Sequence, residues 1–531
     1  MTPRRTLTIA GATLVALATL ALAQSGTSPD QAAITDLVLA NRILASEEVG
    51  VLNVYGHVSY RSPTNPGRFL IARNMAAGLV TSADIYESDL DGRPVSGVVG
   101  AGFSRLGGSD LYPERFIDAA IYKARPDVMA IVTAETPEFV AFSVSSVPVH
   151  AANAPPVVDV RTFAGGQGGL VSTAALGASL AQALGRRNTV LLMGRGAVFA
   201  GPTINGVVGA ANGLRESMRT QLTAAALGGT ISYLDFTPRA PGAAPPQAGR
   251  GARANTPADP TAGDRPWNYW RYLANARLAR ESRQPNPGAP PATGNPDSAL
   301  IEEIVLASRI LSTPEAGILS AYGHVSARSR TNPNHYFIST DRSPGSITAA
   351  DMIENDLDSR AAVPTDRSQF QEVFIHGEIY KARPDVMAIL HAHTPELVSF
   401  GLSSVSLRPV SFAANFIGAG LPVYDIRTYT GGYASPVGCA HCISTPELGR
   451  ALAEVLGSKG ASLLFGHGIA VVGPSLPALV SRAYDMRMNA VIQQMARSLG
   501  GTVNYLGEPQ GSATVSNPAA WEYWKRRVSG N

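Results

Sequence analysis

Three histidines in the second half of the sequence have the spacing of metal ligands. His391 and His393 are separated by one residue and follow the short apolar run Val386–Leu390. If that run is a strand, side chains at i and i+2 share a face, so both imidazoles can reach one point. His467 stands between two glycines, which let the backbone approach closely. The three imidazoles together are typical of a site for a divalent metal ion.

Two further residues could move protons beside such a site. Glu372 and His376 are four residues apart in a segment whose pattern predicts a helix that stops at Pro384. At this spacing the two side chains share a face of the helix, which strengthens the prediction of a functional site beside the histidines. For His376 and His324, a hydrogen-bonded imidazole in the core stays open as the alternative.

The elements around these residues alternate between helix and strand. Helical spacing covers residues 299–311 and 374–383, and short apolar runs at 386–390, 462–465 and 470–472 indicate buried strands. This alternation predicts an α/β fold in which helices cover a mixed sheet.

The chain is an internal duplication. The segment IYKARPDVMAI occurs at Ile121–Ile131 and again, unchanged, at Ile379–Ile389. Similar segments flank both copies in the same order, and each copy closes with a Trp-rich segment. We expect one domain at residues 28–281, with a Pro/Gly-rich insertion at 237–264, then a linker at 282–298 and a second domain at 299–528.

Composition and charge narrow the class of partner. Of 531 residues, 45% are hydrophobic and 16% charged, which supplies packed cores and excludes collagen-like or wholly disordered chains. The net charge of +3, without a basic run, argues against a nucleic-acid partner. A small molecule is the expected ligand.

Residues 1–23 have the anatomy of a secretory signal peptide. Arg4 and Arg5 precede an apolar stretch, and a small-residue cleavage site follows. We expect an exported protein, periplasmic or secreted, by the Sec or the twin-arginine route. No second run of eighteen apolar residues occurs, so we expect no stable membrane insertion; an uncleaved anchor stays open. Cys439 and Cys442 predict a local disulfide, with free thiols, a redox pair or a metal site as alternatives.

Three separated motifs carry a resemblance to a known family. FQEVFIHGEIYKARPDVMAILHAHTPELVSF, GHVSAR and LLFGHGIAVVG resemble the class II aldolase/adducin-head family, and most closely its decarboxylases of ring-cleavage and dihydroxyphthalate-type intermediates. The resemblance implies two tandem three-layer α/β/α domains, each with a mixed, largely antiparallel sheet. It also implies one divalent metal per chain, zinc first and manganese or another ion as alternatives. The implied metal ligands are His391, His393 and His467. The implied acid/base is Glu372, and we predict Glu372 and His376 as the catalytic residues.

Departures from the family pattern point to the substrate. Members that cleave sugar phosphates resemble one another in a Gly-Asn-x-Ser turn and a Ser-Ser pair, where this chain has Gly323–Ser326 (GHVS) and Phe370-Gln371. A phosphorylated sugar is therefore disfavoured, and a small carboxylated substrate is expected. The candidate substrate-binding residues are His324, Ser326, Arg328 and Arg342, although either arginine could instead be a solvated surface charge.

The first copy lacks the metal-ligand pattern. Thr133 and Glu135 stand where the two spaced histidines are in the second copy, and Arg195 replaces the histidine between glycines. Asp118 matches His376, whereas Glu114 still matches Glu372. A guanidinium repels a cation and could pair with Glu135. We expect a metal-free, catalytically inert first domain.

These observations favour an exported, metal-dependent carbon–carbon lyase. A decarboxylase, or an aldolase, would act through a metal-stabilised enolate of a carboxylated, non-phosphorylated substrate. The alternatives are an adducin-like binding or scaffold protein, and a metal-dependent epimerase or dehydratase. Related proteins resembling this one form rings of four domains, so we expect two chains to associate into a pseudo-tetrameric ring.

Overall fold

The computed structural model describes most of the chain. The described residues are 29–47, 49–95, 111–151, 154–166, 168–226, 295–430, 442–507 and 518–529. The predicted signal peptide, the insertion at 237–264, linker residues 282–294 and Cys439 lie outside them. No helix within the described residues is long and apolar enough to cross a membrane.

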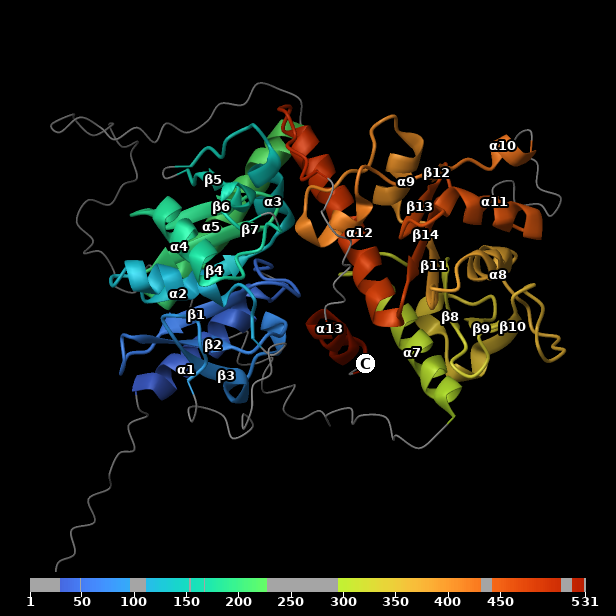
Figure 1. The fold of residues 1–531 in the computed structure, drawn as a ribbon, viewed down its shortest axis with the longest axis horizontal. Coiled ribbons are helices and arrows are strands. Elements are labelled where there is room, and N and C mark those ends of the chain that lie inside the picture. Colours follow the sequence, from blue (N-terminus) through green and yellow to red (C-terminus); the bar gives the residue numbers. More distant parts are fainter. Residues whose placement is uncertain are drawn as a thin grey trace, which may run out of the picture.

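The described residues form two domains, each built on a seven-stranded sheet (Figure 1). The strand orders are β3-β2-β1-β4-β7-β6-β5 and β10-β9-β8-β11-β14-β13-β12, so the second domain repeats the topology of the first. One edge pair in each sheet, β5–β6 and β12–β13, is parallel, and the other pairs are antiparallel. The expected mixed, largely antiparallel sheet is confirmed.

The elements of the first domain come from residues 29–226. Its strands are β1 (His57–Arg61), β2 (Arg68–Ala72), β3 (Ile85–Asp89), β4 (Ala130–Ala134), β5 (Val157–Val158), β6 (Thr189–Leu192) and β7 (Gly196–Gly201). Its described helices are α1 (Pro29–Leu44), α2 (Arg115–Ala124), α3 (Pro137–Val144), α4 (Ala174–Leu184) and α5 (Ile204–Ala226). Its described 3₁₀ turns are η1 (Ala77–Leu79), η2 (Ser82–Asp84) and η4 (Val160–Thr162).

The second domain follows from residue 295. Its strands are β8 (His324–Arg328), β9 (His335–Ser339), β10 (Met352–Asp356), β11 (Ala388–Ala392), β12 (Val423–Tyr424), β13 (Ala461–Leu464) and β14 (Gly468–Gly473). Its described helices are α7 (Pro296–Leu311), α8 (Val373–Ala382), α9 (Pro395–Leu402), α10 (Arg427–Thr430), α11 (Pro446–Leu456), α12 (Leu476–Ser498) and α13 (Pro518–Ser529). Its described 3₁₀ turns are η6 (Pro344–Ser346), η7 (Ala349–Asp351) and η8 (Phe412–Ile417).

The observed element boundaries differ from those expected by one to three residues, and two of the differences have a clear cause. Helix α7 begins three residues early, because the Asn295 side chain accepts a hydrogen bond from the Asp297 N–H and Pro296 suits the first turn. Strand β11 begins at Ala388 rather than Val386, whose N–H instead bonds the Arg383 carbonyl in the turn after α8. The strand also ends later than expected, at Ala392, so His391 lies inside it.

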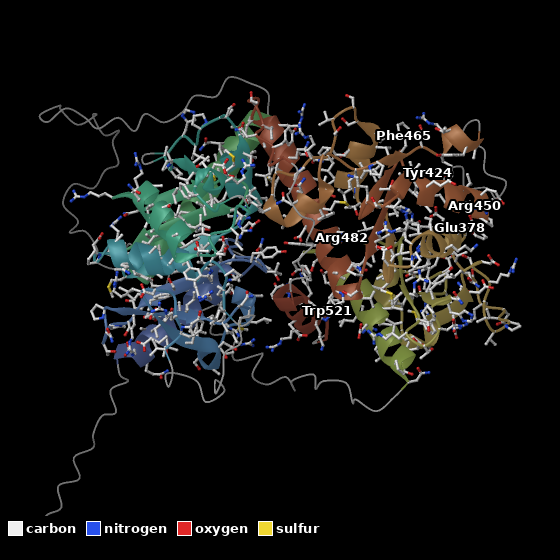
Figure 2. All side chains as sticks on the ribbon, viewed as in Figure 1. Glu378, Tyr424, Arg450, Phe465, Arg482 and Trp521 are labelled. Carbon is white, nitrogen blue, oxygen red and sulfur yellow. The ribbon has the colours of Figure 1, made fainter. Side chains whose placement is uncertain are left out.

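Helices cover both faces of the second sheet. Ile389 packs with α8 and α11, whereas its neighbour Leu390 packs with α7, α9 and α12 on the opposite face. Figure 2 labels Glu378 on α8 and Arg450 on α11, whose Oε2 and Nε atoms are 3.8 Å apart. The three-layer arrangement expected for each domain is therefore present here.

The two domains meet along helix α12, which crosses toward the first domain in Figure 1. Val140 and Val144 of α3 share a small buried core with Ile492 and Ala496 of α12. Helix α13, which carries the labelled Trp521 of Figure 2, packs beside α12 and α7. Its Arg527 pairs with glutamates of both domains, Glu47 and Glu315.

Candidate functional site

Strand pairing brings the predicted site residues together. His391 on β11 lies directly opposite His324 on β8, and opposed residues of antiparallel strands share one face. His393 is two residues further along the chain, just past the end of β11. His467 occupies the turn between β13 and β14, next to Gly466 with a φ of 63°. A Cβ on Gly468 would lie 2.3 Å from the Ala392 carbonyl oxygen, so this turn requires glycine.

Four side chains converge at this edge of the sheet: Glu372, His391, His393 and His467. One potential ligand atom from each lies within 4.8 Å of the others. The Nε2 atoms of His391 and His393 are 2.9 Å apart, and Glu372 Oε2 lies 3.2 Å from His391 Nε2. Glu372 Oε1 lies 3.7 Å from His467 Nε2. We call these four residues the metal-ligand cluster.

The tautomer of His391 suits a metal ligand. Its Nδ1 lies 2.9 Å from the Ile469 carbonyl oxygen, which can only accept, so Nδ1 carries the proton. The Nε2 lone pair then faces His393 and Glu372. Such an outer hydrogen bond is the usual way in which proteins orient a ligating imidazole.

Burial favours the neutral, metal-binding form of the His393 imidazole. It lowers the pKa of His393 to about 4, with a further contribution from His391. Burial opposes ionisation of Glu372, but the imidazoles of His391 and His467 outweigh it and lower the pKa of this carboxyl. Three imidazoles and one carboxylate form a donor set that fits zinc or a similar divalent ion.

Glu372 is held by the backbone as well as by the histidines. It occupies the N-cap position of α8, and its Oε1 accepts a hydrogen bond of 3.0 Å from the Ile443 N–H. Ile443 follows Cys442, which is disulfide-bonded, while Cys439 lies outside the described residues. Glu372 is 7% exposed, so its carboxylate is buried within the cluster.

A second buried group lies directly behind the cluster. His324 Nδ1 is 2.7 Å from His376 Nε2, and His376 Nδ1 is 2.5 Å from Ser326 Oγ. Ser326 Oγ is also 2.9 Å from the Tyr380 hydroxyl. We call these four residues the buried relay. It joins predicted residues His324, Ser326 and His376, and it places His376 behind His324 rather than among the metal ligands.

The two predicted arginines are engaged elsewhere. Arg328 is buried and donates four of its five N–H groups to carbonyl oxygens, those of Pro333, Tyr380, Arg383 and Val386. Arg342 is half exposed and pairs with Asp351 at 2.9 Å. None of these contacts joins either guanidinium to the cluster, so they do not favour the prediction that Arg328 and Arg342 bind substrate.

Three contacts of the site were not predicted from the sequence. Tyr380 completes the buried relay, and the signal was its place in the eleven-residue segment shared with the first copy, where Tyr122 has the same role. Phe370 lies against His324, with ring centroids 4.4 Å apart. The Ile443 N–H is a backbone donor and left no signal in the sequence.

In the first domain an arginine occupies the equivalent place. Arg195 Nη2 lies 2.6 Å from Glu114 Oε2, and its Nη1 lies 4.0 Å from Glu135 Oε2. The pairing expected with Glu135 is therefore the weaker of two, and the main partner is Glu114. Burial raises the pKa of Glu135, whose Oε1 accepts a 3.2 Å hydrogen bond from Ser411 of the second domain.

Comparison with known proteins gives matches in both halves of the chain. The profile of the Class II Aldolase and Adducin N-terminal domain matches residues 35–222 and residues 302–494. A decarboxylase of Talaromyces stipitatus, tropJ, is 32% identical over 236 residues, which span 40% of this chain and 88% of the relative. The 3,4-dihydroxyphthalate decarboxylase of Arthrobacter keyseri is 25% identical over 244 residues, 43% of this chain and 93% of the relative.

Among solved structures, an aldolase II superfamily protein from Pseudomonas syringae aligns over 45% of this chain and 94% of its own. The TM-score is 0.37 and the sequence identity 20%.

Proposed function

The chain belongs to the class II aldolase and adducin family, and from this premise we propose that its second domain is a divalent-metal-dependent carbon–carbon lyase. The reaction proposed is decarboxylation of a small, carboxylated, non-phosphorylated compound. The observation that carries the proposal is the metal-ligand cluster, in which three imidazoles and a buried carboxylate converge within 4.8 Å.

Two observations favour decarboxylation over cleavage of a sugar phosphate. The two relatives named above are decarboxylases and align over most of their own length. The positions that would hold a phosphate carry His324 and Phe370, whose rings lie against each other with centroids 4.4 Å apart. Neither the imidazole nor the phenyl group supplies the hydroxyl groups that a protein would need to bind the phosphate of a sugar phosphate.

The roles of the residues follow from their positions. His391, His393 and His467 would hold the metal, with Glu372 beside them. A divalent ion at this place supplies stabilisation of the negative charge that develops on a substrate oxygen when a carbon–carbon bond breaks. Glu372, as a buried carboxylate, can accept a proton from a substrate hydroxyl and return it to carbon after carbon dioxide leaves.

The first domain is inert in this proposal. Its Arg195 places a guanidinium 2.6 Å from Glu114, the counterpart of Glu372, where a cation would otherwise be bound. Thr133 and Glu135 replace the two spaced imidazoles. The domain therefore retains the fold without the donor set.

We extend the proposal to assembly and location. Tyr55 of the first domain is covered by α12, whereas its counterpart Tyr322 is 70% exposed beside His393. A second chain that presents its α5, the counterpart of α12, would cover Tyr322 in the same way and close a pseudo-tetrameric ring of two chains. The protein would work outside the cytoplasm, as the N-terminal residues 1–23 suggest.

The experiment is elemental analysis of the chain purified without chelator, beside the variant His391→Ala/His467→Ala. Thr133→Ala, at the position that matches His391, is the matched control. We expect about one divalent ion per chain in the parent and the control, and none in the double variant. Carbon dioxide release from a panel of carboxylated phenols and keto acids should follow metal content. A parent chain that takes up neither zinc nor manganese would contradict the proposal and favour an adducin-like binding protein.

A further inference from the structure

The buried relay has one end that faces only protein. Its last member, Tyr380, is 1% exposed, and its hydroxyl bonds only Ser326 Oγ among the described residues. A buried phenol that received rather than donated this bond would leave its own proton without an acceptor. The Tyr380 O–H therefore donates to Ser326.

This end sets the direction of every bond in the relay. Ser326 Oγ accepts from Tyr380, so its own proton goes to His376 Nδ1. A neutral His376 with a bare Nδ1 carries its proton on Nε2, which donates to His324 Nδ1. Burial lowers the pKa of His376 to about 3, which keeps the ring neutral. His324, with Nδ1 accepting, then carries its proton on Nε2.

His324 Nε2 is the open end of the relay. It bonds no atom of the described residues, and His324 shares its sheet face with the directly opposed His391. The ring centroids of these two histidines are 5.2 Å apart. The relay thus ends in an N–H donor beside the metal-ligand cluster.

The first domain shows what the relay does without His376. There Asp118 occupies the matching position and accepts from both neighbours, from His57 Nε2 at 2.8 Å and from Ser59 Oγ at 2.6 Å. A carboxylate that only accepts ends the chain of donors at this residue. The second domain has histidine where the first has aspartate. Because this histidine can donate as well as accept, the series of hydrogen-bond donors continues to the ring of His324.

We infer that His376 is a positioning residue that holds His324 as an N–H donor for an anionic oxygen of the substrate, a carboxylate or a phenolate. The inference rests on the proposed function and adds the group that recognises the substrate. Arg328, the nearby cation that could have bound a carboxylate, has four N–H groups committed to backbone carbonyls. His324 is then the donor that the relay leaves available.

The direct test reads the tautomer and needs no turnover. The full chain is labelled with ¹⁵N in its histidine rings, loaded with zinc, and studied by long-range ¹H–¹⁵N correlation, with His324→Gln and His376→Gln used for assignment. We expect His324 and His376 both to carry the proton on Nε2, with Nδ1 bare. A proton on Nδ1 of His324 would overturn the inference, whatever reaction the protein catalyses.

Two substitutions test the role in binding. His376→Gln retains one acceptor and one donor, and His376→Asp retains acceptors alone, as in the first domain. On the carboxylated compound that gives carbon dioxide, we expect the aspartate variant to raise KM about 10-fold or more with a smaller change in kcat, and the glutamine variant to restore KM toward the parent. Equal KM values in both variants, with metal retained, would refute the role of His376. A chain with the expected tautomers but no metal and no turnover would instead refute the proposed function alone.

Discussion

Tyr55 of the first domain donates its phenolic proton to Asp485 of the second domain, over 3.0 Å between the hydroxyl oxygen and Oδ1. Asp485 is 7% exposed on α12, where burial and the nearby Glu135 raise its pKa well above the ordinary value, against the opposing effect of the Tyr55 bond. Among the residues that the structure describes, no cation pairs with it. The contact between the domains therefore contains a carboxyl group whose protonated form is favoured by folding.

This carboxyl group predicts a pH dependence of stability. An acid whose pKa is raised by folding binds more protons in the folded state, so stability falls as pH rises above the unfolded value of about 3.9. Asp485→Asn removes that loss, and we expect the variant to be more stable than the parent at pH 7 and equal to it below about pH 4. Each unit of raised pKa corresponds to about 1.4 kcal/mol. Urea unfolding from pH 3 to pH 8 measures the difference.

Asp425 offers a control in which the pKa shift, and so the change of stability with pH, has the opposite sign. Its bond to Arg427 lowers its pKa, so the folded state favours the charged form and the stabilisation is present above the unfolded pKa. Asp425→Asn should lower stability at pH 7, by less than about 1 kcal/mol because the pair is partly exposed. Parallel pH profiles for the two asparagine variants would contradict the account of Asp485.

The cluster predicts different results for its two kinds of residue. His393→Ala removes an imidazole and should abolish metal binding, because two imidazoles rarely hold the ion. Glu372→Gln keeps the three imidazoles, so metal should largely remain while turnover falls about 10²–10⁴-fold. Elemental analysis and carbon dioxide release measure the two effects separately. Retained activity in Glu372→Gln would remove this residue from the proton-transfer role.

The first domain can be used to rebuild the cluster. Glu114 is still present at the place of Glu372, and Thr133 pairs across β4 and β7 in the register that His391 has in the second domain. The triple variant Thr133→His, Glu135→His, Arg195→His should therefore raise metal content from about one to about two ions per chain. Thr133→His alone should leave it unchanged. A triple variant that folds and binds no second ion would mean that more than these side chains has changed.

Self-association predicts a measurable mass. Light scattering of the purified chain should give about twice the 55.4 kDa of one chain, less any leader removed. Tyr322→Arg places a charge on the exposed face beside His393 and should shift the mass toward a single chain without loss of metal. Val363→Arg, at another exposed apolar side chain, is the control for the added charge. A parent that stays monomeric at high concentration would refute the ring.

The parts of the site predicted from the sequence are those governed by local geometry. The i, i+2 spacing of His391 and His393 and the glycines around His467 depend on strand and turn geometry alone, and the structure brings these side chains together as expected. The strand boundary was two residues off, because the Val386 N–H is used in a turn. The expected tandem α/β domains followed from the repeat.

The remainder depends on contacts distant in sequence. Arg328 was expected to face a substrate, but its partners are backbone carbonyls. Every residue has a backbone carbonyl, so the sequence does not indicate which of them an arginine will contact. The contact between Asp485 and Tyr55 joins residues that are 430 positions apart in the sequence. It depends on how α12 packs against the first domain. Periodicity gives the faces of a helix but not the neighbour that each face meets.

The contact between α3 and α12 has a consequence for synthesis of the chain. The apolar side chains of Val140, Ala141 and Val144 are covered by Ile492 and Ala496, which lie more than 300 residues later. At roughly 5–20 residues per second, the ribosome needs on the order of 20–70 s to make the covering helix after α3. During that time the nascent first domain presents an apolar face. Chaperone capture of ribosome-bound chains should therefore persist until α12 emerges and then cease.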